Sequence, residues 1–83
     1  MPRYYFDIVD GENLPDTTGS EWPDIQAARI EAVRYSAEVL KEMPERFWNA
    51  EQWTMTVSTG EKIPQFSLKF FAETFKPEGE TKG

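Results

Sequence analysis

The sequence predicts an α+β fold, a two-layer sandwich in which one amphipathic helix packs on a small antiparallel sheet in the order β-(β)-α-β-β. Three observations lead to it. Segments near both ends of the chain alternate apolar and polar side chains with the period of a strand. A long segment between them repeats with the period of a helix. Each element thus has one apolar face, and a helix is available to cover the apolar face of the sheet.

The first strand is predicted over Arg3–Val9, where apolar side chains share one face. Asp10 and Gly11 end it, because Asp-Gly strongly favours turns with positive φ. The following stretch, Glu12–Pro23, holds two prolines and one glycine and is typical of turns. Within it, a short strand around residues 13–14 can fold back on the first.

A helix is predicted from Ile25 to Met43, with the short acceptor side chain of Asp24 as its N-cap. Pro44 closes it, because proline cannot continue a helix. Apolar and small side chains recur at helical spacing and form one stripe on this helix: Ile25, Ala28, Ala32, Ser36, Val39, Leu40 and Met43.

A hairpin is predicted after a connector over Pro44–Gln52. Its strands are Trp53–Ser58 and Gln65–Phe70, joined by a turn at Thr59–Lys62, and Pro64 must start the second strand or lie on an edge. Placing the last strand between the first and the penultimate makes all neighbours antiparallel and leaves Trp53–Ser58 as an open edge. The predicted core comprises Phe6, Trp53, Met55, Val57, Phe66 and Leu68, facing Ile25, Ala28, Ala32, Val39 and Leu40.

Length and composition predict one domain over residues 1–75 and a disordered tail over 76–83. The chain has no cysteine and no histidine, which removes the usual thiol nucleophile, imidazole base and commonest metal ligands. We therefore expect no catalysis, cofactor or metal. A net charge of −6 argues against nucleic acid. No apolar run is long enough for a signal peptide or membrane span, so the expected location is cytoplasmic.

Carboxylates crowd the first 24 residues and raise the alternative of a site for a hard cation. Their spacing does not match a calcium-binding loop. Structural roles are favoured: Asp10 and Asp16 as turn residues, Asp24 as a cap, and Glu12 and Glu21 as solvated side chains.

The chain resembles a family of small alphaproteobacterial proteins of unknown function. The resemblance covers about residues 1–74 and rests on the opening Met-Pro-Arg-Tyr-Tyr-Phe, Asp16-x-x-Gly19, Pro23-Asp24 and the later aromatic motifs. Many members carry histidine at the position of Asp7, so no imidazole function carries over. The resemblance implies a single cytoplasmic domain and supplies no activity to carry over. A looser likeness of residues 1–42 to the antidote proteins of some toxin–antitoxin pairs is an analogy of architecture.

Twelve aromatic residues without visible chemistry favour a non-enzymatic interaction module that self-associates, as a homodimer. The candidate surface consists of Ile30, Phe47, Trp48, Thr54 and Thr56. Phe47 and Trp48 either close the core or form a sticky surface. Two alternatives stay open: an antitoxin-like or regulatory protein that binds a basic partner through its acidic surface, and a binder of ligand or metal through carboxylates.

Overall fold

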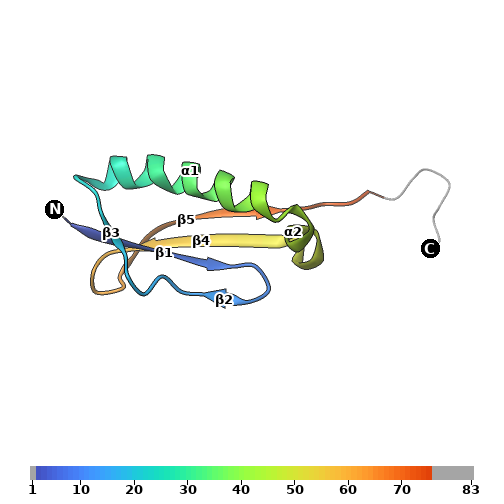
Figure 1. Cartoon of the computed structure of the whole chain (residues 1–83), viewed down its shortest axis with the longest axis horizontal. Coiled ribbons are helices and arrows are strands. Elements are labelled where there is room, and N and C mark those ends of the chain that lie inside the picture. The colour runs from blue at the N-terminus through green and yellow to red at the C-terminus, as the bar shows by residue number, and fades with distance from the viewer. Residues whose placement is uncertain (1, 76–83) are drawn as a thin grey trace.

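The computed structural model describes residues 2–75, which form two layers, with helix α1 lying along one face of an antiparallel sheet (Figure 1). The elements are β1 (Arg3–Val9), β2 (Asn13–Leu14), β3 (Ser20–Glu21), α1 (Ile25–Glu42), α2 (Pro44–Ala50), β4 (Gln52–Ser58) and β5 (Pro64–Phe71). The predicted α+β class and two-layer arrangement are confirmed. The predicted tail over 76–83 lies outside the described residues.

The strand order is β2-β1-β4-β5, with β3 also paired to β1. The predicted order was therefore wrong: within residues 2–75, β4 lies in the centre and β5 forms an edge of the sheet that no other strand covers. The cause is the return of the chain along β1. Because β2 and β3 lead it back to the start of β1, α1 runs parallel to β1 and β4 returns antiparallel to it (Figure 1). Only β4, and not β5, can then pair antiparallel with β1.

The core lies between α1 and the central strands β1 and β4. Met55 and Val57 of β4 are fully buried, as are Ala28 and Ala32 of the helix. In β5, by contrast, Phe66 and Leu68 are only half-buried, since one side of an edge strand has no neighbour. The remaining buried apolar residues are Tyr4, Phe6, Ile8, Phe47 and Trp53. The predicted core is thus confirmed at its centre and less complete along β5.

Helix α1 begins as predicted. The carboxylate of Asp24 accepts a hydrogen bond of 2.9 Å from the backbone N–H of Ala27. Pro44, however, does not open an irregular connector: it is the first residue of α2, a position at which a missing N–H costs nothing. Helix α2 ends at Glu51, whose backbone is left-handed (φ 61°) and donates its N–H to the carbonyl of Phe47.

Replacing Asp24 by alanine is expected to lower the free energy of unfolding by about 1 kcal/mol, because the N–H of Ala27 loses its acceptor. Urea unfolding followed by circular dichroism measures the change. Asp24→Ser is the matched control, since serine also caps helices and should lose much less. Equal losses in the two variants would contradict a capping role.

Candidate functional site

One candidate site is built by the arm, which we define as residues 12–21 and which includes β2 and β3. The arm pairs with β1 at both ends: Leu14 lies opposite Ile8, and Ser20 opposite Tyr4. Between these pairs the arm bulges away from the strand. The carboxylate of Asp16 fills the gap and accepts the backbone N–H of Phe6 at 3.1 Å. A side chain thus takes the place of a strand partner in the middle of the β1 edge.

Asp16 also organises its own loop. Its second oxygen accepts the backbone N–H groups of Thr18 at 3.1 Å and Gly19 at 2.9 Å. Burial alone would raise the pKa of the Asp16 carboxyl, but the N–H donors of Gly19, Phe6 and Thr18 outweigh it, and the pKa is lowered. Asp16 is therefore an ionised structural acceptor.

Gly19 is required where the arm rejoins the sheet. Its backbone has φ +75°, and a Cβ atom there would lie 2.9 Å from Cε2 of Tyr5 and 3.0 Å from the carbonyl oxygen of Tyr4. Only glycine adopts this positive φ freely and has no Cβ atom to displace the neighbouring backbone. The arm is thus held in one position against β1.

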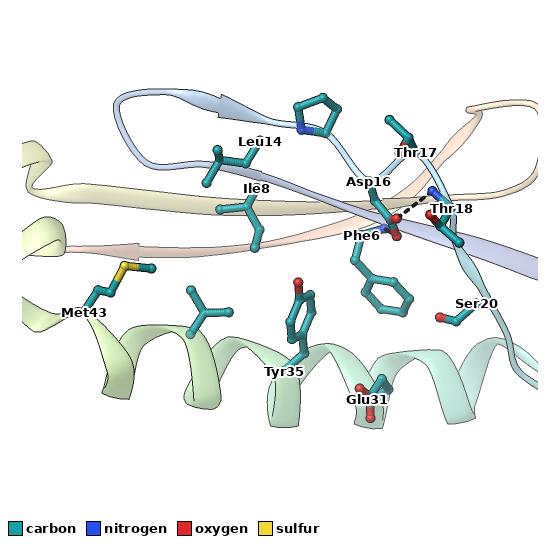
Figure 2. A pocket seen from close by; sticks show the side chains of 12 residues that line it. Phe6, Ile8, Leu14, Asp16, Thr17, Thr18, Ser20, Glu31, Tyr35 and Met43 are labelled. Carbon is teal, nitrogen blue, oxygen red and sulfur yellow. Dashed lines mark hydrogen bonds between the residues drawn. The ribbon is translucent and has the colours of Figure 1, made fainter.

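Between the arm and α1 runs a groove of about 560 Å³, which we call the arm groove (Figure 2). Its floor is apolar, and Figure 2 shows Phe6 and Ile8 extending from β1 toward the side of the helix that carries Tyr35. The rings of Phe6 and Tyr35 meet edge to face with centroids 6.2 Å apart. The other residues that line the arm groove are Leu14, Pro15, Asp16, Thr17, Thr18, Ser20, Glu31, Val39 and Met43.

An ion pair with one buried partner, Asp10, holds α2 against the turn after β1. Nε of Arg46 lies 2.6 Å from one carboxylate oxygen of Asp10, and the same guanidinium donates to Glu12 at 3.0 Å. Because Arg46 donates directly to Asp10, it outweighs burial and lowers the pKa of that carboxyl. The ion pair sets the rotation of α2, and with it the positions of the aromatic residues that follow.

Phe47 and Trp48 separate on α2. Phe47 is 8% exposed and closes the core, with its ring edge to face against Phe70 at 5.2 Å. Trp48 is 58% exposed. Successive side chains on a helix point about 100° apart, so Trp48 points away from Arg46 and toward the β5 side. Of the two, only Trp48 is available as an interaction residue on the surface.

A second candidate site, the β5 flank, is formed by exposed apolar side chains on the β5 side of the molecule. Ile30 is 55% exposed and Val33, one turn further along α1, is 60% exposed. Phe70 of β5 is 52% exposed. Helical spacing directs Trp48 of α2 to the same side. Between α1 and β5 a groove of about 230 Å³ is lined by Val33, Ser36, Ala37, Leu40, Trp53, Leu68, Lys69 and Phe70.

Thr54 and Thr56 do not lie on a free edge, and that prediction was wrong. They belong to the central strand β4, on the sheet face that α1 does not cover. Thr54 lies between Val9 and Lys69, and Thr56 between Asp7 and Ser67. The structure therefore exposes Ile30 and Trp48 on the two helices and places the threonines on the uncovered sheet face.

The search of family models matched residues 3–71 to the domain of unknown function DUF6894. The chain belongs to the DUF6894 family. No match was found in the search of curated proteins or in the search of solved structures. For this DUF6894 member the match spans β1 to β5, and therefore includes both the arm groove and the β5 flank.

The acidic residues among the first 24 of this DUF6894 member have structural partners. The carboxylate of Asp7 accepts hydrogen bonds from the backbone N–H of Asp16 and from the ammonium of Lys62. Glu21 forms an ion pair with Arg3 at 3.2 Å. Over residues 2–75 no group of three or more acidic side chains is arranged to hold a metal ion. Glu12 and Glu21 are thus ion-paired as well as exposed, and the pairing is not predicted from the sequence. In the same part of the chain, no helix is long and apolar enough to cross a membrane.

Proposed function

We propose that this protein is a non-enzymatic interaction module that forms a homodimer through the β5 flank. The observation that carries the proposal is the free edge of β5 beside a groove lined by apolar side chains. An exposed edge strand offers unpaired backbone groups to another chain. Pro64 lies at the start of β5, and Lys69 is the single charged residue in the strand, so most of this edge is open to pairing.

The backbone of β5 supports pairing at Ser67. Phe6 donates its N–H to Asp16 on the arm side, so its backbone groups face away from β4. Backbone groups alternate sides along antiparallel strands. By this alternation the backbone groups of Thr56 on β4 point toward β1. Ser67 lies opposite Thr56, so the N–H and carbonyl of Ser67 point away from β4, to the free edge.

A two-fold axis at Ser67 gives compatible neighbours. Phe66 then lies opposite Leu68 of the second copy, on the sheet face that α1 covers. Gln65 lies opposite Lys69 of the second copy, on the other face, so no like charges oppose each other directly. An interface of this kind is isologous, as most homodimer interfaces are.

Helix α1 adds side chains to the same interface. Joining the two sheets edge to edge places both copies of α1 on the same face of the combined sheet. Ile30 and Val33 of each copy are then directed toward the other copy. The carboxylates of α1 lie on the other side of the helix by helical spacing, at Glu31, Glu38 and Glu42. Two chains of net charge −6 can therefore approach at the flank without opposing these acidic groups.

Sedimentation velocity at micromolar concentration tests the proposal. We expect a dimer, and we expect Trp48→Ala to weaken it roughly thirtyfold, the typical effect of removing a tryptophan that anchors an interface. Val33→Glu on the helix and Ser67→Pro at the edge should each shift the protein to monomer with native circular dichroism. Thr56→Lys is the control, because Thr56 lies in the central strand.

A strict monomer at several hundred micromolar would overturn the proposal. So would a dimer that Thr56→Lys weakens as much as Val33→Glu does, since the contact would then lie on the uncovered sheet face.

A further inference from the structure

The arm groove has an apolar floor and a helical wall that is apolar inside and bordered by glutamates on its outer side, and the proposed dimer does not use it. We propose that it binds a basic amphipathic helix of a partner protein, with apolar side chains in the groove and lysine or arginine side chains against the bordering glutamates.

The floor suits apolar side chains. Phe6 and Ile8 are buried at its base, and Tyr35, Val39 and Met43 rise at intervals of four residues along α1. Leu14 faces them from the arm (Figure 2). Residues four apart share one face of a helix, so these α1 side chains form a continuous apolar wall. The volume of about 560 Å³ lies within the usual range for ligand sites.

The charge on this side of α1 is negative. Glu31 lines the groove, and Glu38 and Glu42 follow it by 7 and 11 residues, which places all three on one side of the helix. Arg34 pairs with Glu31 at 2.8 Å. The described ion pairs include neither Glu38 nor Glu42, and the described residues that line the groove include neither lysine nor arginine. A cationic partner is favoured, whereas nucleic-acid phosphates would be repelled.

The occupied edge of β1 favours a helix over an extended peptide. A peptide that adds to a sheet needs free backbone groups on the edge strand. On β1 these groups pair with β2 and β3, and the N–H of Phe6 pairs with Asp16. A helix satisfies its own backbone and binds through side chains alone. From Glu31 to Met43 the wall is about 18 Å long, the length of roughly three helical turns.

The experiment uses a synthetic 15-residue peptide of leucine and lysine in which leucine recurs at positions i, i+4, i+7 and i+11. An isomer of the same composition, rearranged to remove the apolar stripe, is the first control. Fluorescence anisotropy of the labelled peptides gives the affinities. We expect the amphipathic peptide to bind at least roughly tenfold more tightly than the isomer, since only it buries leucine side chains together.

Two pairs of variants locate the site. The double variant Glu38→Gln with Glu42→Gln should weaken peptide binding about fivefold, whereas Glu61→Gln with Glu73→Gln changes net charge equally and should leave it within about twofold. Leu14→Ser should weaken binding roughly tenfold through loss of apolar contact, and Ile63→Ser, an exposed residue away from the groove, should not.

Equal binding of the isomer, or equal losses in the two glutamine pairs, would overturn the proposal, because binding would then follow net charge alone. Peptide binding is also measured in Ser67→Pro and Val33→Glu. Unchanged affinity there supports a site separate from the β5 flank, and loss of binding in both would place the peptide on that flank instead. Failure of the chain to dimerise would leave the peptide result unaffected.

Discussion

Replacing Trp53 by alanine is expected to lower the free energy of unfolding by about 3–5 kcal/mol. Trp53 is 3% exposed on the central strand β4 and belongs to the same buried cluster as Phe6 and Met55. Truncation leaves a cavity that a strand held on both sides cannot close. The total stability of a domain this size is on the order of 4–12 kcal/mol, so the variant should be close to unfolded at 37 °C. Urea unfolding measures the loss.

Trp53→Phe is the informative comparison. The indole N–H of Trp53 is buried and has no acceptor within the described residues. An unsatisfied buried donor costs about 1–3 kcal/mol, which phenylalanine removes while it keeps an aromatic ring in place. The gain offsets much of the lost volume, and we expect a net change within about 1 kcal/mol. A loss below 1 kcal/mol in Trp53→Ala would contradict the buried position and with it the register of β4.

The sequence predicted the faces of the strands correctly because burial on one face imposes a period of two. Met55 and Val57 are inward on β4 for that reason. The same pattern says nothing of strand order, which depends on the path between β1 and α1. The predicted return strand at residues 13–14 was sufficient to predict the order. A chain that returns along β1 is back at the start of β1 when α1 begins, so α1 runs parallel to β1. With that step, β4 could have been placed beside β1.

The candidate sites were harder to predict because each depends on a short element. Phe47 and Trp48 are adjacent and equally apolar, and only the rotation of α2, fixed by Arg46 and Asp10, separates them. Pro44 followed by Glu45 is a usual helix start and was a usable signal. The predicted central position of β5 does not make Val33 and Phe70 neighbours on a flank, whereas the edge position that the structure gives β5 does.

The turn role predicted for Asp16 in the motif Asp16-x-x-Gly19 is confirmed, but its hydrogen bond to the edge of β1 was not predicted. The turn bonds within the loop are local, since Asp16 accepts the N–H groups of Thr18 and Gly19. The bond to Phe6 joins residues ten apart. No local pattern indicates that a carboxylate will pair with a strand edge, and the arm groove depends on that bond.

Replacing Asp16 by asparagine is expected to lower the free energy of unfolding by about 2–3 kcal/mol. One carboxylate oxygen accepts from Phe6 and the other from Thr18 and Gly19. Asparagine has one oxygen, so its NH₂ group must face an N–H donor on one side whichever way it turns. A part-buried donor is then left unsatisfied, and a charge-assisted bond is lost. Asp16→Ala should lose at least as much.

The loss should depend on pH with a defined sign. The folded-state pKa of Asp16 lies below its ordinary value near 3.9, so protonation destabilises the folded state. The contribution of Asp16 is therefore complete above about pH 5 and is lost as the pH falls through the folded-state pKa. Urea unfolding of the wild type and Asp16→Asn should show a gap at pH 7 that narrows at pH 2.5. Glu61→Gln, which removes an exposed carboxylate, should show almost no gap at either pH. A gap of equal size at both pH values would mean that the charge of Asp16 does not hold the arm against β1.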